Sequence, residues 1–323
     1  MSAPERIPPG RMSGTAPAAE ATRELLRQGA LTVRGQITAA SNTVLFGTVE
    51  HAGSSLPCVY KPVAGERPLW DFPDGNLAQR EVAAYEVSRA TGWDLIPATV
   101  LRDGPYGPGM CQAWVGEPPD AADHDDEDAP SAQAAGAAPG NGPESGPEEE
   151  SAPLLALVDG EEPGEGWKAV GFADVGGGRT ALLVHADDPR LRRLAVLDAV
   201  LNNGDRKGGH LLPRPDGALY AIDHGVTFHV DDKLRTLLWG WAGEELTGEA
   251  VEALRRLSTA LCADASGPAD GAEAAEAPLA ARLAELLTEA EVQAVGKRVE
   301  ALLSSGRHPL PSGEWPAIPW PPV

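Results

Sequence analysis

Apolar and β-branched residues alternate with polar ones in short runs through residues 31–62, which predicts strands joined by hairpins. Ser-Asn and Gly-Ser pairs separate the runs and supply the turns. Residues 77–91 follow with apolar side chains at helical spacing, and Gly92 can end this helix. Two further strands are predicted near residues 98–102 and 109–115. The first part of the chain therefore predicts a small antiparallel sheet with one helix.

The pattern after residue 154 predicts a second unit that is mainly helical. Two strands flank a triple glycine at residues 176–178, a composition typical of a hairpin turn. An acidic residue and a proline then open a helix that ends near residue 201. The run LYAIDHGVTFHV predicts two short strands around a turn at residues 223–225. Later helices are predicted at residues 247–262 and 279–304, the second interrupted at the capping-box pattern of Thr288 and Glu291.

Composition marks three segments that belong to neither unit. Residues 1–29 are rich in proline and small side chains and predict a flexible arm that leads into a short helical turn. Residues 117–150 contain eleven acidic residues and no lysine or arginine, so residues 117–153 predict a disordered insert. We expect the proline-rich tail to pack onto the second unit, because Trp315 and Trp320 are costly to expose. The predicted boundaries are 1–29 for the arm, 30–116 for the first lobe, 117–153 for the insert, 154–308 for the second lobe and 309–323 for the tail.

The chain has 323 residues and a formal net charge of −22, which argues against the basic footprint of a nucleic-acid-binding protein. Nowhere do about 18 uncharged apolar residues run together, so stable membrane insertion is not predicted. Three widely spaced cysteines favour a reducing, cytoplasmic location over a disulfide framework. The acidic insert has two interpretations. One is a solvated loop, which we favour because charge blocks are commonly solvated, and the other is a docking site for a basic partner.

Two carboxylates in loops of the second unit suit nucleotide chemistry. Asp205 follows a helix in the sequence Asn-Gly-Asp-Arg, and Asp223 comes eighteen residues later in Asp-His-Gly. Phosphoryl transfer requires one acid to orient or deprotonate the acceptor and another to hold Mg²⁺ against the phosphates. Asp205 fits the first role and Asp223 fits the second.

Lys61 is the candidate cation for the phosphates, because it lies in a strand among apolar neighbours and therefore needs an anion. The chain has only five lysines, so each one is a weak pointer to function. Glu81 on the following helix is expected to pair with Lys61 and fix its direction. Glu86 is the runner-up. It lies five positions further on, about 140° round the helix, so the two glutamates cannot both serve.

Five short segments occur in a characteristic order: SNTVLFG, VYKP, REVAAYEVSRATGWDLIPATV, NNGDRKGGHLL and AIDHG. Together they resemble the phosphatidylinositol 3-/4-kinase-like family, and most closely its uncharacterised actinobacterial members. The resemblance spans about residues 31–115 and 154–303. It implies an α+β, two-lobed protein-kinase-like fold, with a small antiparallel-sheet N-lobe carrying one helix and a larger, mainly helical C-lobe. It also implies that ATP and Mg²⁺ bind in the cleft between the lobes.

The resemblance implies a role for each residue that matches a family motif. In the N-lobe, the turn at Ser41, Asn42 and Thr43 would cover the phosphates, while Lys61 would bind them and Glu81 would orient Lys61. The hinge would offer backbone groups to adenine, and it comprises Gln112, Ala113, Trp114 and Val115. In the C-lobe, Asp205 would act on the acceptor hydroxyl and Asp223 would hold the metal ion.

The catalytic loop departs from the family pattern Asp-Arg-His-x-x-Asn, since it begins with Asp205, Arg206 and Lys207 and ends with His210. His210 stands where an asparagine would bind the second metal ion. Imidazole prefers softer metals than Mg²⁺, so either Mn²⁺ is favoured or only one metal ion is retained. Lys207 replaces a histidine and could hold the transferring phosphate. Asp205, Arg206 and Lys207 form the expected catalytic group.

The expected activity is ATP-dependent transfer of phosphate to a hydroxyl acceptor. The acceptor is open between a lipid headgroup, a protein and a small molecule, and the lack of a basic amphipathic helix favours a protein slightly over a lipid. One alternative is a pseudokinase that senses nucleotide without turnover. A weaker one is a two-lobe adaptor that binds no nucleotide. The variant Asp205→Asn separates the first two functions, because only an enzyme has turnover to lose.

Overall fold

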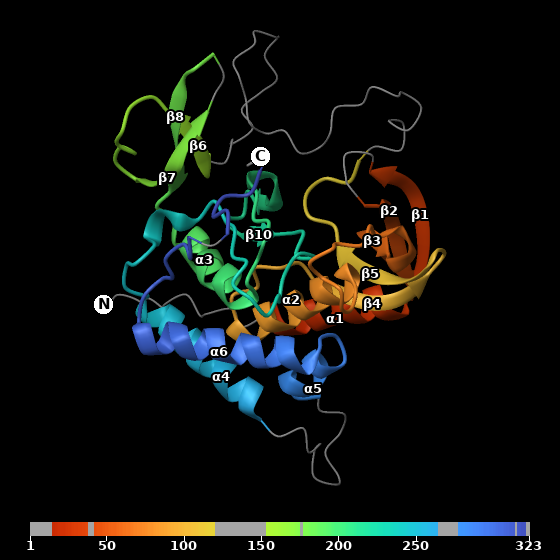
Figure 1. Ribbon diagram of the computed structural model, residues 1–323. Helices are drawn as coiled ribbons and strands as arrows, with labels where there is room; N and C mark the ends of the chain where they lie inside the picture. Colours follow the sequence, from red (N-terminus) through yellow and green to blue (C-terminus); the bar gives the residue numbers. More distant parts are fainter. Residues whose placement is uncertain are drawn as a thin grey trace, which may run out of the picture.

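The N-lobe is a five-stranded antiparallel sheet with the strand order β1-β2-β3-β5-β4 (Figure 1). The computed structural model describes residues 15–37, 42–119, 153–174, 177–263, 277–313 and 315–320. The strands are β1 (Ala30–Ile37), β2 (Val44–His51), β3 (Ser54–Pro62), β4 (Thr99–Gly104) and β5 (Gly107–Ala113). Side chains alternate along β3, so Cys58 and Tyr60 are fully buried on one face while Lys61 points to the other.

Helix α1 (Thr15–Gln28) covers the face of the sheet opposite Lys61. Leu26 is fully buried in this helix, where it joins Val49, Cys58 and Cys111 in one apolar cluster. The prediction of a flexible arm over residues 1–29 is therefore wrong from residue 15 onward. The apolar stripe of this segment is buried by a sheet that lies later in the chain.

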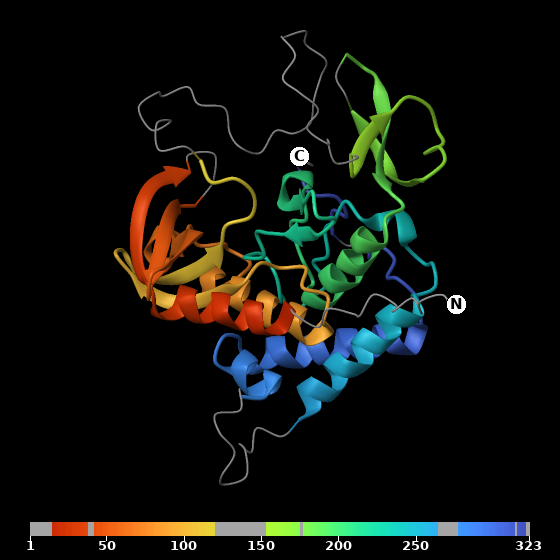
Figure 2. The ribbon, with the colours of Figure 1, turned by 180° about the vertical axis from the view of Figure 1, so that it is seen from behind.

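Helix α2 (Leu77–Thr91) has the predicted bounds. The Asn76 side chain accepts a hydrogen bond from the Gln79 N–H at its start, and Gly92 ends it in the left-handed conformation. Most of α2 is buried on all sides, and Figures 1 and 2 show it between the N-lobe sheet and the C-lobe helices. The helix is thus part of the boundary between the lobes.

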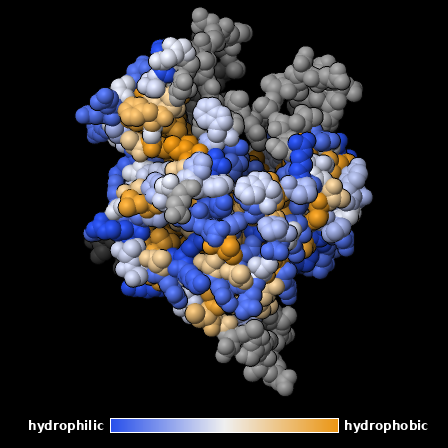
Figure 3. All heavy atoms as spheres, in the orientation of Figure 1, coloured by the Kyte–Doolittle hydropathy of each residue, from blue (hydrophilic) through white to orange (hydrophobic). Residues whose placement is uncertain are grey.

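The C-lobe begins with a three-stranded antiparallel sheet in the order β6-β8-β7, which projects from the body in Figure 1. Its strands are β6 (Leu155–Val158), β7 (Trp167–Asp174) and β8 (Thr180–Ala186). The predicted hairpin through the glycine-rich turn is confirmed by the pairing of β7 with β8. Apolar colour gathers over this sheet in Figure 3. Its strands carry two exposed apolar side chains, Leu157 at 54% and Phe172 at 61%.

Helices build the rest of the C-lobe. They are α3 (Pro189–Leu201), α4 (Gly248–Cys262), α5 (Leu279–Ala284) and α6 (Glu289–Ser305), with 3-10 turns at Gly208–His210 and Trp239–Trp241. Asp188 caps α3, and the predicted interruption before α6 is confirmed by a capping box between Thr288 and Glu291. The α+β, two-lobed fold is confirmed. Among the described residues, no helix has the length and apolar character needed to cross a bilayer.

Two short strands, β9 (Leu211–Pro213) and β10 (Leu219–Ala221), pair after the loop that carries Asp205 and His210. The second strand predicted within LYAIDHGVTFHV is wrong, because no strand follows β10 before residue 231. Asp223 and Phe228 both have positive φ angles, of 61° and 67°, which break an extended run. The segment instead forms a loop anchored by the Phe228 N–H, which donates to the Leu201 carbonyl.

The tail packs onto the C-lobe as predicted. The carbonyl of Ala317 accepts hydrogen bonds from the Thr236 N–H at 3.0 Å and from Trp239 Nε1 at 2.8 Å. The expectation that this packing would bury Trp320 is wrong, since its side chain is 72% exposed. The predicted insert lies outside the described residues from 120 to 152, and so do residues 1–14 of the predicted arm.

Candidate functional site

Lys61 and Glu81 form the centre of the site. Strand β3 directs Lys61 away from the α1 side of the sheet, and its Nζ lies 2.7 Å from Glu81 Oε1 on α2. The Glu81 side chain is only 2% exposed. Glu86 faces another way and pairs with Arg23 and Arg282, so the contact expected for Glu81 rather than Glu86 is present.

Asp223 approaches the same lysine from the C-lobe. Its Oδ1 lies 3.0 Å from Lys61 Nζ, although 162 positions separate the two residues. The Lys61 ammonium lowers the pKa of Asp223 against the effect of burial. Burial would lower the pKa of Lys61, but the carboxylates of Asp223 and Glu81 raise it above its ordinary value. Lys61 is therefore a cation held between two carboxylates.

The Glu81 carboxylate also binds the loop that carries Asp223. Its second oxygen, Oε2, accepts a hydrogen bond of 2.9 Å from the backbone N–H of His224. The His224 ring is fully buried, and burial lowers its pKa well below the usual range. One buried carboxylate on α2 thus fixes both Lys61 and the position after Asp223.

His210 lies beside Asp223, as its expected metal role requires. Its Nε2 is 3.4 Å from Asp223 Oδ2. Burial lowers the pKa of His210 to about 4, although Asp223 acts in the opposite direction, so the ring is neutral at pH 7. The Lys207 N–H donates to Nδ1 at 3.5 Å, so the proton of the neutral ring lies on Nε2, and Nε2 must lose it to bind a metal ion. Within the described ranges, no three His, Cys, Asp or Glu side chains converge as a ready-made metal site. The pair supplies two donors, which fits an ion that takes its other ligands from phosphates and water.

Asp205 and Lys207 lie on the loop after α3. Lys207 Nζ is 3.0 Å from Asp205 Oδ2, and the Asp205 N–H donates to Asn203 Oδ1 at 3.0 Å. Burial raises the pKa of Asp205, while the Lys207 ammonium acts against this rise. Both side chains remain partly exposed, at 29% and 25%, and can therefore meet a substrate.

Arg206 has a different role from the catalytic one predicted. Its side chain is fully buried and makes a bidentate pair with Asp198 of α3, with bonds of 2.9 and 3.0 Å. It also donates to the Ile222 carbonyl, directly before Asp223, and contacts His224 Nε2 at 2.7 Å. A buried guanidinium cannot touch a substrate, so Arg206 is a positioning residue.

Sequence reasoning missed Asp198 and Asn203. Asn203 Nδ2 donates to Asp198 Oδ1 at 2.9 Å, which adds a third hydrogen bond to that buried carboxylate. The available signal was an acid on the otherwise apolar face of α3, because a carboxylate at such a position requires a buried partner.

The turn between β1 and β2 is only partly described, and Ser41 lies outside the described residues. Asn42 Oδ1 accepts a hydrogen bond from the Arg67 N–H at 2.9 Å, and the Thr43 N–H donates to the Gly65 carbonyl at 3.2 Å. These contacts tie the turn to the segment after β3. The predicted covering of phosphates by this turn stays a prediction.

The predicted hinge, residues 112–115, uses part of its hydrogen-bonding capacity internally. The Ala113 N–H donates to the Ala98 carbonyl, and the Trp114 N–H donates to the Pro57 carbonyl. Gln112 is buried and donates from Nε2 to Thr99 Oγ1. The prediction that these backbone groups serve adenine is therefore wrong for the two N–H groups. Within the described residues, the Val115 N–H donates no hydrogen bond to another part of the chain.

A hollow of about 410 Å³ lies beside the hinge. Phe46 pairs with Val59 and Thr48 with Pro57 across β2 and β3, and alternation puts these side chains on the face that carries Lys61. Pro57 is four residues from Lys61, about 13 Å along the strand. The full lining is Arg34, Phe46, Thr48, Ser55, Pro57, Pro118 and Pro119.

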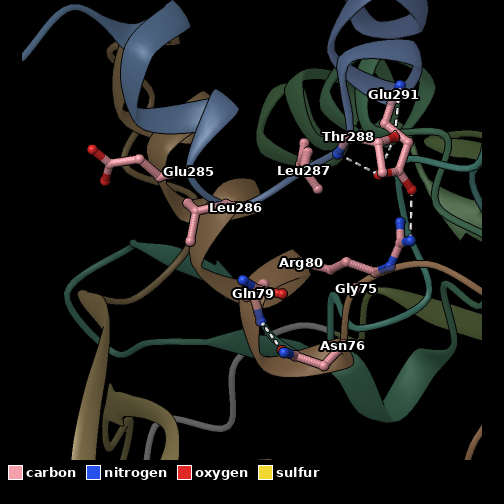
Figure 4. A pocket seen from close by; sticks show the side chains of 9 residues that line it. All are labelled: Gly75, Asn76, Gln79, Arg80, Glu285, Leu286, Leu287, Thr288 and Glu291. Atoms are coloured by element: carbon pink, nitrogen blue, oxygen red, sulfur yellow. Dashed lines mark hydrogen bonds and ion pairs between the residues drawn. The ribbon is translucent and has the colours of Figure 1, made fainter.

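A second cavity, of about 170 Å³, lies where the start of α2 meets the α5–α6 junction. Figure 4 shows Arg80 extending across it toward Glu291, with which it forms a buried ion pair. Arg80 Nη1 also donates to the Thr227 carbonyl at 2.7 Å. The cavity belongs to the contact between α2 and the C-lobe rather than to the Lys61 site.

Comparison with known proteins gives one close relative. No family model matches the chain. Protein Rv2133c of Mycobacterium tuberculosis (strain ATCC 25618 / H37Rv) is 44% identical over 297 residues, which cover 92% of this chain and 94% of that protein. Its name describes no activity.

Solved structures with a similar arrangement include kinases. A Golgi casein kinase is 12% identical with a TM-score of 0.45, covering 89% of this chain and 75% of that one. Hydra Fam20 with sugar is 11% identical with a TM-score of 0.46, covering 91% and 89%. The Golgi casein kinase with Mn/ADP bound is 12% identical with a TM-score of 0.40, covering 94% and 80%. None of these proteins is described as a phosphatidylinositol kinase, so that narrower resemblance gains no support.

Proposed function

The chain belongs to the same family as Protein Rv2133c, and we propose that its members are ATP-dependent phosphotransferases that act on a hydroxyl acceptor. The observation that carries the proposal is the position of Lys61, whose Nζ lies 2.7 Å from Glu81 and 3.0 Å from Asp223. A strand lysine oriented by a helix glutamate, opposite a loop aspartate, is the arrangement that binds the phosphates and metal ion of a nucleotide.

The nucleotide would lie along the Lys61 face of the N-lobe sheet. Lys61 would bind the phosphates, and the base would enter the hollow beside the hinge, where Phe46 and Pro57 offer apolar surface. The Val115 backbone is the hinge group left to bind the base edge. Burial of a flat aromatic base against such surface is favourable.

Asp223 and His210 would hold the metal ion, which neutralises phosphate charge and orients the phosphates for transfer. A neutral imidazole beside a carboxylate suits Mn²⁺ better than Mg²⁺, because Mg²⁺ prefers oxygen ligands. We therefore propose that Mn²⁺ supports activity better than Mg²⁺.

Asp205 would accept the proton of the acceptor hydroxyl. The acceptor oxygen then forms a bond to the γ-phosphorus, the bond from that phosphorus to the bridging oxygen breaks, and ADP leaves. Lys207, 3.0 Å from Asp205, would hold the transferred phosphoryl group at this moment. The acceptor class stays open between lipid headgroup, protein and small molecule, and the cytoplasmic location and the basic partner of the acidic segment stay predictions from composition.

A nucleotide-sensing pseudokinase is the second candidate function. It is favoured by Lys207 and His210, which stand where the phosphatidylinositol 3-/4-kinase-like pattern has a histidine and an asparagine. Both candidates require nucleotide binding, so turnover is the property that separates them.

The test begins with a thermal-unfolding titration with ATP and Mn²⁺ or Mg²⁺. Ligand at a hundred times its dissociation constant adds about 2.7 kcal/mol to the free energy of unfolding. Asp223→Ala should remove the metal-dependent shift. Asp231→Ala is the matched control, because that side chain is 78% exposed, and it should retain the shift.

Turnover is then followed as ADP release in the wild type and in Asp205→Asn. An enzyme loses turnover in this variant and keeps nucleotide binding, whereas a sensor shows no turnover in either protein. No stabilisation of the folded wild type by either metal-nucleotide mixture contradicts both candidates.

A further inference from the structure

Arg235 lies next to Asp205 although the two are thirty positions apart. The Arg206 N–H donates to the Arg235 carbonyl at 3.0 Å, and the Arg235 N–H donates to the Asn203 carbonyl at 2.9 Å. Arg206 and Thr236 pair as a parallel bridge, and both side chains are buried. Side chains alternate along paired extended segments, so Asp205 and Arg235 share the opposite, outward face.

The Arg235 guanidinium has unused donors. Its Nη2 makes a long hydrogen bond of 3.3 Å to the Ile318 carbonyl, and its Nε is buried without a partner in the described part of the chain. No carboxylate pairs with it there, in contrast to Arg190, which binds Asp188 with several hydrogen bonds. The chain has a net charge of −22, so carboxylates are plentiful. An arginine that pairs with none of them in the described part of the chain is a candidate anion-binding group.

Lys207 and Arg235 together give the Asp205 position an excess of positive charge. Lys207 Nζ lies 3.0 Å from Asp205, and Arg235 also counteracts the rise in the pKa of Asp205 that burial causes. Lys233 does not add to this excess, because it stacks on Trp315 at 3.5 Å and faces the carboxylate of Asp71. Two cations therefore surround one carboxylate.

The nucleotide does not need both of these cations. On the proposed function, Lys61 and the metal ion at Asp223 already face the phosphates, and Lys207 faces the group being transferred. The Nη1 of Arg235 makes no hydrogen bond within the described residues. A forked guanidinium there can bind a carboxylate or phosphate through two parallel hydrogen bonds.

We infer that the phosphoryl acceptor carries a carboxylate or phosphate close to the hydroxyl that reacts, and that Arg235 binds this anionic group. The inference rests on the proposed function and adds the chemical class of the acceptor. A neutral alcohol or sugar would leave the guanidinium without a partner.

The test measures binding of small probes by calorimetry to the full chain saturated with Mn²⁺ and a non-hydrolysable ATP analogue. The analogue fills the position of the transferred phosphate, so a further anion must bind elsewhere. The probes are glycerol 3-phosphate, glycerate and neutral glycerol, which separate phosphate from carboxylate recognition. Each is titrated into the wild type, Arg235→Gln and Arg255→Gln, the last being a control at an exposed arginine of α4.

We expect at least one anionic probe to bind about tenfold more tightly than glycerol, and Arg235→Gln to abolish about that factor while Arg255→Gln keeps it. Equal binding of all three probes to the wild type, or equal anion binding in Arg235→Gln and Arg255→Gln, overturns the inference. Weaker binding of the ATP analogue in Arg235→Gln also overturns it, because Arg235 would then serve the transferred phosphate. Failure of the analogue to bind the wild type refutes the proposed function itself, and this result is visible before any probe is added.

Discussion

Asp198→Asn should destabilise the protein more than the loss of any surface ion pair. Asp198 and Arg206 are both fully buried, and their carboxylate and guanidinium share bonds of 2.9 and 3.0 Å. An asparagine keeps one acceptor oxygen but turns an N–H₂ group toward a guanidinium that can only donate. The charge of Arg206 is then left buried beside His224, with no carboxylate bonded to it.

Removing one partner of a buried ion pair costs about 3–5 kcal/mol in the free energy of unfolding. At about 2–4 °C per kcal/mol for a chain of this size, the melting temperature should fall by roughly 6–20 °C. Arg206 also donates to the Ile222 carbonyl, next to Asp223. The affinity for the metal-nucleotide complex should therefore fall as well.

Thermal and urea unfolding check the first effect, with Arg193→Gln as the control. Arg193 pairs with Glu249 at 3.0 Å, but these side chains are 36% and 50% exposed, so its loss should cost about 0.2–1 kcal/mol. The double variant Asp198→Leu with Arg206→Met should recover much of the stability, because it removes both buried charges. A loss in Asp198→Asn no larger than in Arg193→Gln refutes the reasoning.

Three further predictions concern the site and the pH dependence. Glu81→Gln should weaken nucleotide binding about tenfold, because it removes a charged partner of Lys61. Glu86→Gln should leave the nucleotide affinity unchanged, and fluorescence titration with a nucleotide analogue compares the two variants. Asp205→Asn should bind Mn²⁺ and ATP like the wild type while Asp223→Asn should not, and equal behaviour of the two variants in calorimetry would contradict their separate roles. Burial lowers the pKa of His308 to about 4, so between pH 6.5 and 4 the unfolded chain binds more protons than the folded one. The free energy of unfolding therefore falls as the pH drops through this window, by up to about 3 kcal/mol from this group. His308→Gln should flatten this part of the stability profile measured by urea unfolding, and an unchanged slope would show that other groups cause the pH dependence.

Local patterns predicted the elements whose ends are encoded by capping residues. Helix α2 begins after Asn76 and ends at Gly92, and the interruption before α6 falls at the Thr288 capping box. Helical angles showed that Glu81 and Glu86 could not both serve, and the Lys61 contact agrees with the choice of Glu81. These signals lie within a few residues of the feature they describe.

The failures came from contacts between distant segments. The flexible arm became α1 because a sheet that follows it buries Leu26. Arg206 was expected at the catalytic position because a loop motif does not show which of its side chains turns inward toward Asp198. The hinge N–H groups were expected to be free, but neighbouring strands supply carbonyls for Ala113 and Trp114. Burial of this kind depends on the assembled fold and not on local spacing.

The way in which α2 is buried determines how the cleft can open. Ala83, Ala84, Tyr85 and Val87 belong to the large apolar cluster of the C-lobe, whereas a cluster of only three buried residues, with Met110 as its member from the sheet, joins α2 to the N-lobe. We therefore expect α2 to move with the C-lobe in any opening of the two lobes. The Lys61–Glu81 contact joins the sheet to α2, so we expect such an opening to break it.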